Sequence, residues 1–257
     1  MRQLWNSFKI AFAMYSKIPM LRADWSKENM RYVMCFFPLI GICIGALQLG
    51  WGYLAPLICQ NSLLPAVGHV LIPVLVTGGI HLDGLLDTAD ALSSYQPMER
   101  KLEILKDSHA GAFAILVGIC YFLLALGVWS ELSWGQLPVL GVGYVLSRAL
   151  SGLAVVTFPC AKNTGLVALF SDAAQKARVR VTMVLFLVVC VAGAWGLHGI
   201  YGPALLVGAA LCFAHYYHMS KKQFGGITGD LAGYFVQICE LFMAVCVLLA
   251  GRIGGMG

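Results

Sequence analysis

Three aspartates lie within one short apolar stretch, "GGIHLDGLLDTADAL" (residues 78–92), although the chain of 257 residues has only 12 acidic residues. Asp83, Asp87 and Asp90 are spaced at i, i+4 and i+7, so a helix would place all three on one face. Neighbouring carboxylates near lipid repel one another and lose hydration, and a hard cation such as Mg²⁺ removes both penalties. The stretch therefore predicts metal and phosphate chemistry; a solvated helix face just outside the bilayer is the alternative.

A second acidic element lies near the C-terminus, where "GGITGD" (225–230) shares the pattern GGIxxD with residues 78–83. On a helix, Asp230, Gln237 and Glu240 fall within about 80° of arc, and Glu240 lies about 15 Å beyond Asp230 along the axis. A glutamate so deep in an apolar segment needs a partner, such as Arg148, or a polar cavity. We expect two glycine-broken helices that face one another across a site. A chance similarity and a purely structural buried pair are the alternatives.

Basic and polar residues near these elements suit a phosphate-bearing substrate. Arg148 is the only basic residue well inside a predicted span, and arginine can hold a phosphate in a bidentate fork. His81 lies about 200° round a regular helix from Asp83, so we do not expect it to share a metal with the aspartates. For a single lysine, a loop charge that only sets topology is the alternative. The predicted substrate-binding or phosphate-binding residues are His81, Lys106, Ser108, His109, Arg148, Lys162, Lys221 and Thr228.

The elements that must position these residues are membrane helices. The chain is 60% hydrophobic and 11% charged, with a mean hydropathy of +0.81, whereas soluble domains are about 25% charged. We predict an all-α, polytopic membrane bundle that forms one domain over residues 1–257, with residues 1–32 as an amphipathic cytoplasmic segment. The net charge of +5 does not indicate nucleic-acid binding, because the basic residues lie in short loops.

Apolar stretches of about 20 residues predict about seven transmembrane helices. They lie at about 33–56, 63–80, 112–130, 137–158, 179–198, 201–217 and 231–250. Basic residues occur in alternate connections, apart from Arg252, so the positive-inside rule places the N-terminus in the cytoplasm. The segments with chemically suggestive residues then share the cytoplasmic side. We expect one site at that face, built from broken or interfacial helices.

The segments "HLDGLLDTAD", "ILKDSHAGAFAI" and "GGITGDLAGYFVQICE", in this order and after the start "MYSKIP", resemble the cobalamin synthase family, the adenosylcobinamide-GDP ribazoletransferases. The resemblance covers most of the chain. It implies a Mg²⁺-dependent enzyme of the bacterial inner membrane, surrounded by lipid and with its site facing the cytoplasm. The implied substrates are adenosylcobinamide-GDP and α-ribazole or its 5′-phosphate, which are joined with release of GMP. Whether such a protein forms a homo-oligomer or associates with other corrinoid-pathway enzymes stays open.

The resemblance also implies roles for the acids, carried over by motif position. Asp83, Asp87 and Asp90 would hold the metal and the GDP diphosphate. The other acids would complete the metal shell or orient the nucleophile, and which acid acts as a general base, if any does, stays open. The implied catalytic residues are Asp83, Asp87, Asp90, Asp107, Asp230 and Glu240, and the implied metal ligands are Asp83, Asp87, Asp90 and Asp230.

Several positions depart from the family pattern, among them Asn163 and Thr164, which lack the acid that the family has there. His109 and Lys162 stand where the family often has arginine, and Ala91 stands where it has glycine. Because lysine lacks the planar fork of arginine, these departures put phosphate contacts in doubt more than the activity.

Two other classes of protein fit part of the pattern. A phosphotransferase like the CDP-alcohol enzymes, or a prenyltransferase, also places aspartates on helices beside Mg²⁺ and a diphosphate, but the present motifs differ from theirs. A non-enzymatic cation transporter would need its acids near the middle of the bilayer. Glu240 alone fits that requirement, and most of the acids do not.

Overall fold

The computed structural model describes residues 2–107, 109–161, 166–197 and 199–255, and within these ranges it is helical, with one isolated bridge between Cys160 and Ile227 as its only β pairing. The short helices are α1 (Arg2–Tyr15), α2 (Lys27–Met30), α5 (Ile80–Ser93), α6 (Met98–Ile104), η1 (Trp134–Gln136) and α9 (Leu166–Ala173). The long helices are α3 (Val33–Ile58), α4 (Leu63–Thr77), α7 (Ala112–Glu131), α8 (Leu137–Thr157), α10 (Lys176–Leu197), α11 (Tyr201–Phe224) and α12 (Gly229–Ile253). The predicted all-α membrane bundle is confirmed.

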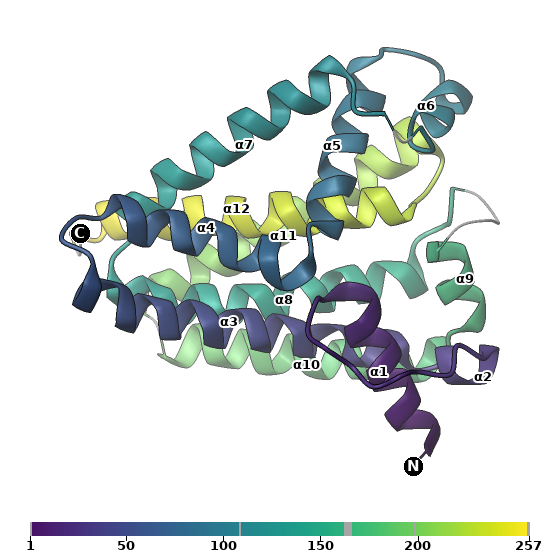
Figure 1. The fold of residues 1–257 in the computed structure, drawn as a ribbon, viewed down its shortest axis with the longest axis horizontal. Coiled ribbons are helices and arrows are strands. Elements are labelled where there is room, and N and C mark those ends of the chain that lie inside the picture. Colours follow the sequence, from purple (N-terminus) through teal and green to yellow (C-terminus); the bar gives the residue numbers. More distant parts are fainter. Residues whose placement is uncertain (1, 108, 162–165, 198, 256–257) are drawn as a thin grey trace.

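Five helices are long and apolar enough to cross a membrane: α3, α7, α8 with the preceding η1, α10 and α12. They coincide with five of the predicted spans, because each is a nearly continuous apolar run of about 20 residues or more. Helix α11, predicted as a span over 201–217, runs alongside the others (Figure 1) but ends in a polar stretch and does not meet the same test. The number of seven spans therefore stays a prediction.

The predicted span at 63–80 is interrupted before its end. Helix α4 stops at Thr77, and α5 starts at Ile80 at an angle of 95° to it. Gly78 and Gly79 form the corner with φ values of 65° and 81°, a left-handed conformation that glycine adopts at little cost. As a result α5 runs across the bundle instead of continuing the axis of α4 (Figure 1).

Close packing of the long helices relies on small residues, as is common in membranes. Helices α3 and α8 meet at Gly41 and Gly45, and a Cβ atom on Gly41 would lie 2.3 Å from the carbonyl oxygen of Tyr144. Side chains of the bundle interior, such as Ile40, Ala149 and Val236, are almost fully buried. The contact fixes α8, and with it Arg148, relative to the rest of the bundle.

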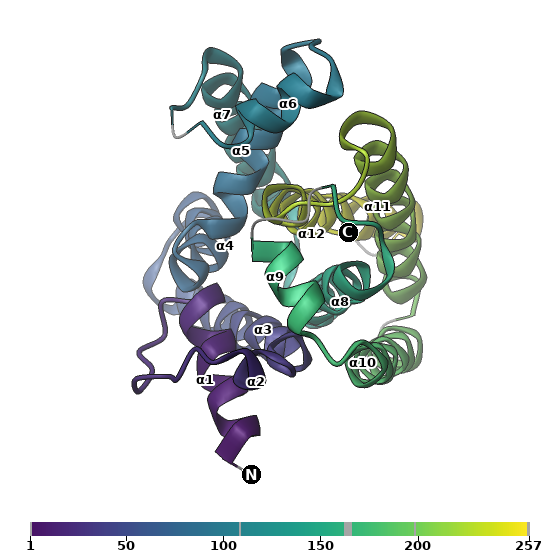
Figure 2. The same ribbon diagram turned by 90° about the vertical axis from the view of Figure 1, so that its right-hand side faces the viewer.

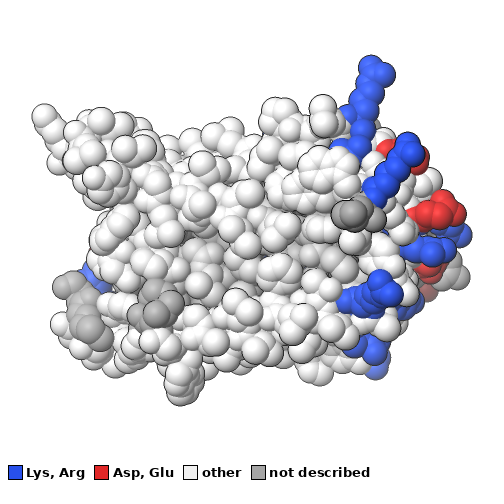
Figure 3. Space-filling view, turned by 90° about the horizontal axis from the view of Figure 1, so that it is seen from below, with Lys and Arg blue, Asp and Glu red and all other residues white. Residues whose placement is uncertain are grey.

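The charged residues gather at one end of the molecule, which Figure 3 shows on the right. We call this the charged end; it carries α2, α6 and α9 (Figure 1), and Figure 2 looks directly at it. Arg252, the exception to the alternation of basic residues, lies at the other end of α12 and pairs there with Glu131. The segregation of charge agrees with the predicted topology, while the side on which the N-terminus lies stays a prediction.

Candidate active site

Helix α5 presents its aspartates on one face, as the spacing predicts. Asp83 is exposed, and Asp87 and Asp90 are half-buried. The opposite face packs into the protein through buried residues, among them Gly84, Leu85, Thr88 and Ala89. The aspartates therefore line the outer side of a helix whose inner side is part of the core.

Helices α5 and α12 cross closely enough to bring Asp230 beside this face. A Cβ atom on Gly84 would lie 2.4 Å from the carbonyl oxygen of Asp230, and one on Gly233 would lie 3.1 Å from that of His81. Helix α12 also follows a Gly-Gly break, since Gly225 has a φ of 76° and ends α11. Thr228 caps α12, and its hydroxyl accepts a hydrogen bond from the Leu231 N–H at 3.2 Å. The two glycine-broken helices are confirmed and lie side by side, but they cross in direct contact at Gly84 and Asp230; a site between them stays a prediction.

The carboxylates of Asp83, Asp87, Asp90 and Asp230 interact electrostatically, and we call these four residues the acidic cluster. Asp83, Asp230 and Asp90 all repel a negative charge on Asp87, and Asp83 does the same for Asp230. Within the described ranges, no three His, Cys, Asp or Glu side chains are close enough together to hold a metal ion by themselves. Mg²⁺ commonly uses only one or two protein carboxylates, with water and substrate phosphates as its other ligands. The acidic cluster has the donor chemistry for such an ion.

Asp90 also has a structural role that the sequence analysis missed. Its carboxylate accepts hydrogen bonds from the Gly111 N–H at 2.5 Å and the Ala114 N–H at 2.8 Å, at the start of α7. A Cβ atom on Gly111 would lie 2.7 Å from this carboxylate, so glycine permits the approach. Asp90 thus satisfies free N–H groups of α7 in the way an N-cap residue does, and it brings Gly111, at the end of the segment that precedes α7, to the acidic cluster. No local signal shows this, because the cap lies 21 residues before Gly111.

In that segment, Asp107 and His109 form an exposed pair. The carboxylate of Asp107 accepts a hydrogen bond from the backbone N–H of His109, and its Oδ1 lies 2.7 Å from the ring Nδ1. These hydrogen bonds lower the pKa of the Asp107 carboxyl below its ordinary value. Nδ1 of His109 is therefore engaged. Ser108, predicted to contact substrate, lies outside the described residues.

Two further connections meet at the same end. The N–H of Ile227 donates to the carbonyl of Pro159 at 2.8 Å, and the N–H of Ala161 donates to the carbonyl of Ile227 at 3.0 Å. Gly226 allows the contact, because a Cβ atom there would lie 2.4 Å from the Pro159 oxygen. The segments 158–161 and 225–230 are thereby joined, and the predicted convergence of separate connections at one end is confirmed. Lys162, which follows directly, is outside the described residues.

The two other lysines predicted to bind phosphate, Lys106 and Lys221, lie at the charged end. Lys106 and Lys221 are both exposed. The ammonium of Lys221 lies 5.6 Å from the centre of the Tyr217 ring, and that of Lys106 has no described partner. Their roles as phosphate ligands stay predictions.

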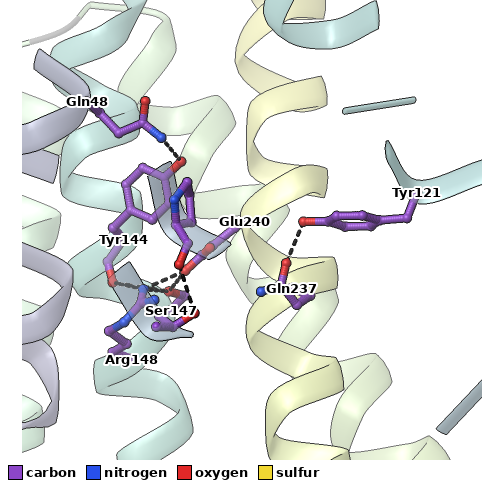
Figure 4. Close-up of polar contacts among 9 residues, drawn as sticks. Gln48, Tyr121, Tyr144, Ser147, Arg148, Gln237 and Glu240 are labelled. Atoms are coloured by element: carbon purple, nitrogen blue, oxygen red, sulfur yellow. Dashed lines mark hydrogen bonds and ion pairs between the residues drawn. The ribbon is translucent and has the colours of Figure 1, made fainter. Parts of the chain in front are cut away.

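Arg148 on α8 and Glu240 on α12 lie inside the bundle and point toward one another (Figure 4). Arg148 Nη1 is 2.5 Å from Glu240 Oε1, and the two side chains are 1% and 9% exposed. Ser147 donates to the same oxygen at 2.9 Å. Glu240 has the arginine partner that the sequence predicts, while ten helical residues, about 15 Å, separate it from Asp230. This is the geometry of the structural buried pair, and direct contact of either residue with a substrate stays a prediction.

The ion pair belongs to a larger set of polar groups from several helices. Tyr121 donates to Gln237 Oε1 at 2.5 Å, and Gln48 donates to the hydroxyl of Tyr144 at 2.9 Å (Figure 4). A cavity of about 30 Å³, large enough for a water molecule or two, lies between Glu240, Tyr121 and Tyr144. We call this set the buried network; it comprises Gln48, His69, Tyr121, Tyr144, Ser147, Arg148, Gln237 and Glu240.

His81, predicted to contact substrate, points into the protein instead of toward the acidic cluster. It is 4% exposed, and its ring contacts those of Tyr15 and Phe37. This agrees with the helical angle that separates it from Asp83. Neither ring nitrogen has a hydrogen-bond partner among the described residues.

Fold and site together define a polytopic α-helical membrane protein with a cluster of carboxylates where broken helices converge at one end. A family model described as "Cobalamin-5-phosphate synthase" matches residues 7–248, and the chain belongs to this family. It is 47% identical to the adenosylcobinamide-GDP ribazoletransferase of Lachnoclostridium phytofermentans, over 95% of this chain and 94% of that protein. Proteins of the same name from Clostridium botulinum and Geobacillus kaustophilus are each 30% identical, over 94% and 92% of this chain and 96% and 93% of theirs. No solved structure is significantly similar.

Proposed function

We propose that this protein is an adenosylcobinamide-GDP ribazoletransferase of cobalamin biosynthesis. The observation that carries the proposal is the 47% identity to a protein of that name over 95% of the chain. The site supports it, because the acidic cluster lies beside Gly111 at the start of α7, and the segment 158–161 is joined to the start of α12 at the same end. A diphosphate substrate needs such a combination of carboxylates for a metal ion and nearby cations and N–H groups for its oxygens.

The reaction that fits is displacement at phosphorus. A hydroxyl of α-ribazole, or of its 5′-phosphate, forms a bond to the phosphorus attached to cobinamide, and the bond from that phosphorus to GMP breaks. The hydroxyl loses its proton, which Asp83, the exposed member of the acidic cluster, would accept. Because such transition states need little covalent help, positioning and charge compensation by the protein supply most of the rate.

We further propose that the reaction depends on Mg²⁺. Asp87 and Asp230 would hold the ion, since both face the other carboxylates of the acidic cluster. When bound, the ion supplies charge neutralisation for the diphosphate and for the leaving phosphate. Lys106 and Lys221, exposed at the same end, would then meet the outer phosphate oxygens.

The charged end would face the cytoplasm of a bacterium, with the bundle in the inner membrane. The support is the segregation of Lys and Arg to this end, apart from Arg252, which Glu131 pairs at the opposite end. The phosphate-bearing substrates would then reach the site from the cytoplasm.

The proposed function is tested with purified protein in lipid nanodiscs. Adenosylcobinamide-GDP, α-ribazole and Mg²⁺ are added, and GMP and the corrinoid product are quantified by chromatography. We expect both products in equal amounts, and neither when EDTA replaces Mg²⁺. Folded protein that releases no GMP under any of these conditions would refute the function, whereas full turnover in EDTA would refute only the metal requirement.

A further inference from the structure

His81 is an unusual buried residue. Its side chain is 4% exposed, and both ring nitrogens lack a hydrogen-bond partner among the described residues. Buried polar atoms are nearly always paired, because an unpaired one forfeits its hydration without compensation. Both nitrogens of this imidazole therefore keep a hydrogen-bonding capacity that no described residue uses.

Two aromatic rings, those of Tyr15 and Phe37, lie beside this imidazole. The Tyr15 ring lies nearly parallel to it, with centroids 6.3 Å apart, and the Phe37 centroid is 5.7 Å away. Phe170 lies on another side of Tyr15, with the two ring centroids 6.2 Å apart. Flat apolar walls beside an unpaired hydrogen-bonding ring are the features that recognise a planar heteroaromatic molecule.

Helix α9 contacts this aromatic group through Phe170, whose ring lies beside that of Tyr15. Figure 2 shows α9 lying over the middle of that end, between α1, α4, α8 and α12. Its bounds span only eight residues, and it packs mainly on α2 and α8. Phe170, the aromatic residue of α9, is 1% exposed and contributes the ring next to Tyr15. A helix this short, attached to few elements, can move away at lower cost than the long helices.

We propose that His81, Tyr15 and Phe37 form the subsite for the azole base of the nucleoside substrate, and that Phe170 occupies this subsite until α9 moves aside. The inference rests on the proposed function, which supplies a substrate with such a base. His81 hydrogen-bonds to the free ring nitrogen of the azole, and the aromatic rings hold its faces.

The test is the affinity for α-ribazole in nanodiscs without the second substrate, with ribose 5-phosphate as a probe that lacks the base. In His81→Leu, which keeps a buried apolar side chain, we expect α-ribazole to bind roughly tenfold more weakly. We expect unchanged binding of adenosylcobinamide-GDP and of ribose 5-phosphate. His81→Gln, which retains hydrogen-bonding groups, should recover part of the loss. Wild-type affinity in His81→Leu, or an equal loss for every ligand, would overturn the proposal.

Phe170 provides an independent measurement. If its ring occupies the subsite, Phe170→Ala removes a competitor, and α-ribazole should bind roughly tenfold more tightly. Leu169→Ala, at an exposed neighbour on the same helix, is the matched control and should change nothing. Weaker binding in Phe170→Ala would contradict the proposed occupation.

These outcomes separate the inference from the proposed function. Wild-type protein that binds α-ribazole through His81 but releases no GMP would refute the transferase activity and retain the azole subsite. Protein that turns over while His81→Leu binds α-ribazole normally would refute the subsite alone.

Discussion

The acidic cluster and the buried network each contain one acid of α12, Asp230 and Glu240, but only the carboxylate of Glu240 is paired with a cation. Glu240 in the buried network has an arginine 2.5 Å away and a serine hydroxyl at 2.9 Å. The acidic cluster forms no ion pair with any described lysine or arginine, and its carboxylates repel one another. The buried network supplies the countercharge for its own acid. The acidic cluster, in which Asp90 accepts hydrogen bonds from the start of α7, has no countercharge among the described residues and would be stabilised by an added cation.

This difference suggests a structural role for the buried network and a binding role for the acidic cluster. Ion pairs and hydrogen bonds of the buried network connect α3, α4, α7, α8 and α12, so they hold the helices in place. The acidic cluster is at least partly open to solvent, since Asp83 is exposed and the other three aspartates are half-buried. Mutations in the acidic cluster should therefore lower turnover, and mutations in the buried network should lower stability.

The largest effect is expected in the acidic cluster. Asp87→Asn keeps the size of the side chain but removes a charge that a metal ion needs, so turnover should fall about 10²–10³-fold. Unfolding in detergent should be unchanged or shifted to higher temperature, since repulsion is relieved. Glu103→Gln, at an exposed acid of α6, is the control for loss of a charge at the same end. Equal turnover of Asp87→Asn and Glu103→Gln would remove Asp87 from the site.

The second effect concerns stability. Arg148→Met leaves Glu240 buried without its partner and should lower the free energy of unfolding by about 3–5 kcal/mol. The double variant Arg148→Met/Glu240→Leu removes both charges and should recover most of this loss. Denaturant unfolding in detergent gives both values. A double variant as unstable as the single one would show that the pair does more than compensate charge.

A smaller effect should follow from the crossing of α5 and α12. Gly84→Ala places a Cβ atom 2.4 Å from the Asp230 carbonyl oxygen, so the helices must separate. Because misplacement of a reacting group by about 1 Å can cost up to a hundredfold, kcat should fall roughly tenfold or more. Gly127→Ala in α7, where a Cβ atom meets nothing within 4 Å, is the matched control. Full activity of Gly84→Ala would mean that this crossing does not set the site.

The smallest effect should be at Asp90, which belongs to the acidic cluster and also caps α7. The Gly111 and Ala114 N–H groups donate to different oxygens of Asp90, and asparagine has only one acceptor oxygen. Asp90→Asn should therefore lose one of the two hydrogen bonds and destabilise the start of α7 by about 1 kcal/mol. Faster hydrogen exchange at Gly111 and Ala114 would report the loss, with the amides of Tyr121 as an internal reference. Unaltered exchange at both positions would argue against the capping role.

The sequence was sufficient for features that depend on local pattern or on a large local penalty. Apolar runs predict five of the long helices, and the cost of burying Glu240 alone predicts its arginine partner. The i, i+4, i+7 spacing predicts the common face of Asp83, Asp87 and Asp90. The alternation of basic residues predicts that separate connections converge at one end.

Other features depend on contacts between distant residues and could not be read from local pattern. Hydropathy over 63–80 predicts one continuous span; the Gly78-Gly79 pair predicts a break there, but not that the following helix turns by 95°. The bonds from Asp90 to α7 join residues more than 20 positions apart. The cavity beside Glu240 arises only when separate helices meet.

The central claim is that the acidic cluster, and not the buried network, binds the metal ion and diphosphate. The most direct measurement uses Mn²⁺ as a paramagnetic substitute for Mg²⁺, with GDP, and determines Mn²⁺ affinity by electron paramagnetic resonance in nanodiscs. We predict wild-type affinity in Glu240→Gln and in Tyr121→Phe, a milder change in the buried network, and a loss of at least tenfold in Asp87→Asn. Unchanged Mn²⁺ affinity in Asp87→Asn, together with a loss in Glu240→Gln or Tyr121→Phe, would contradict the claim.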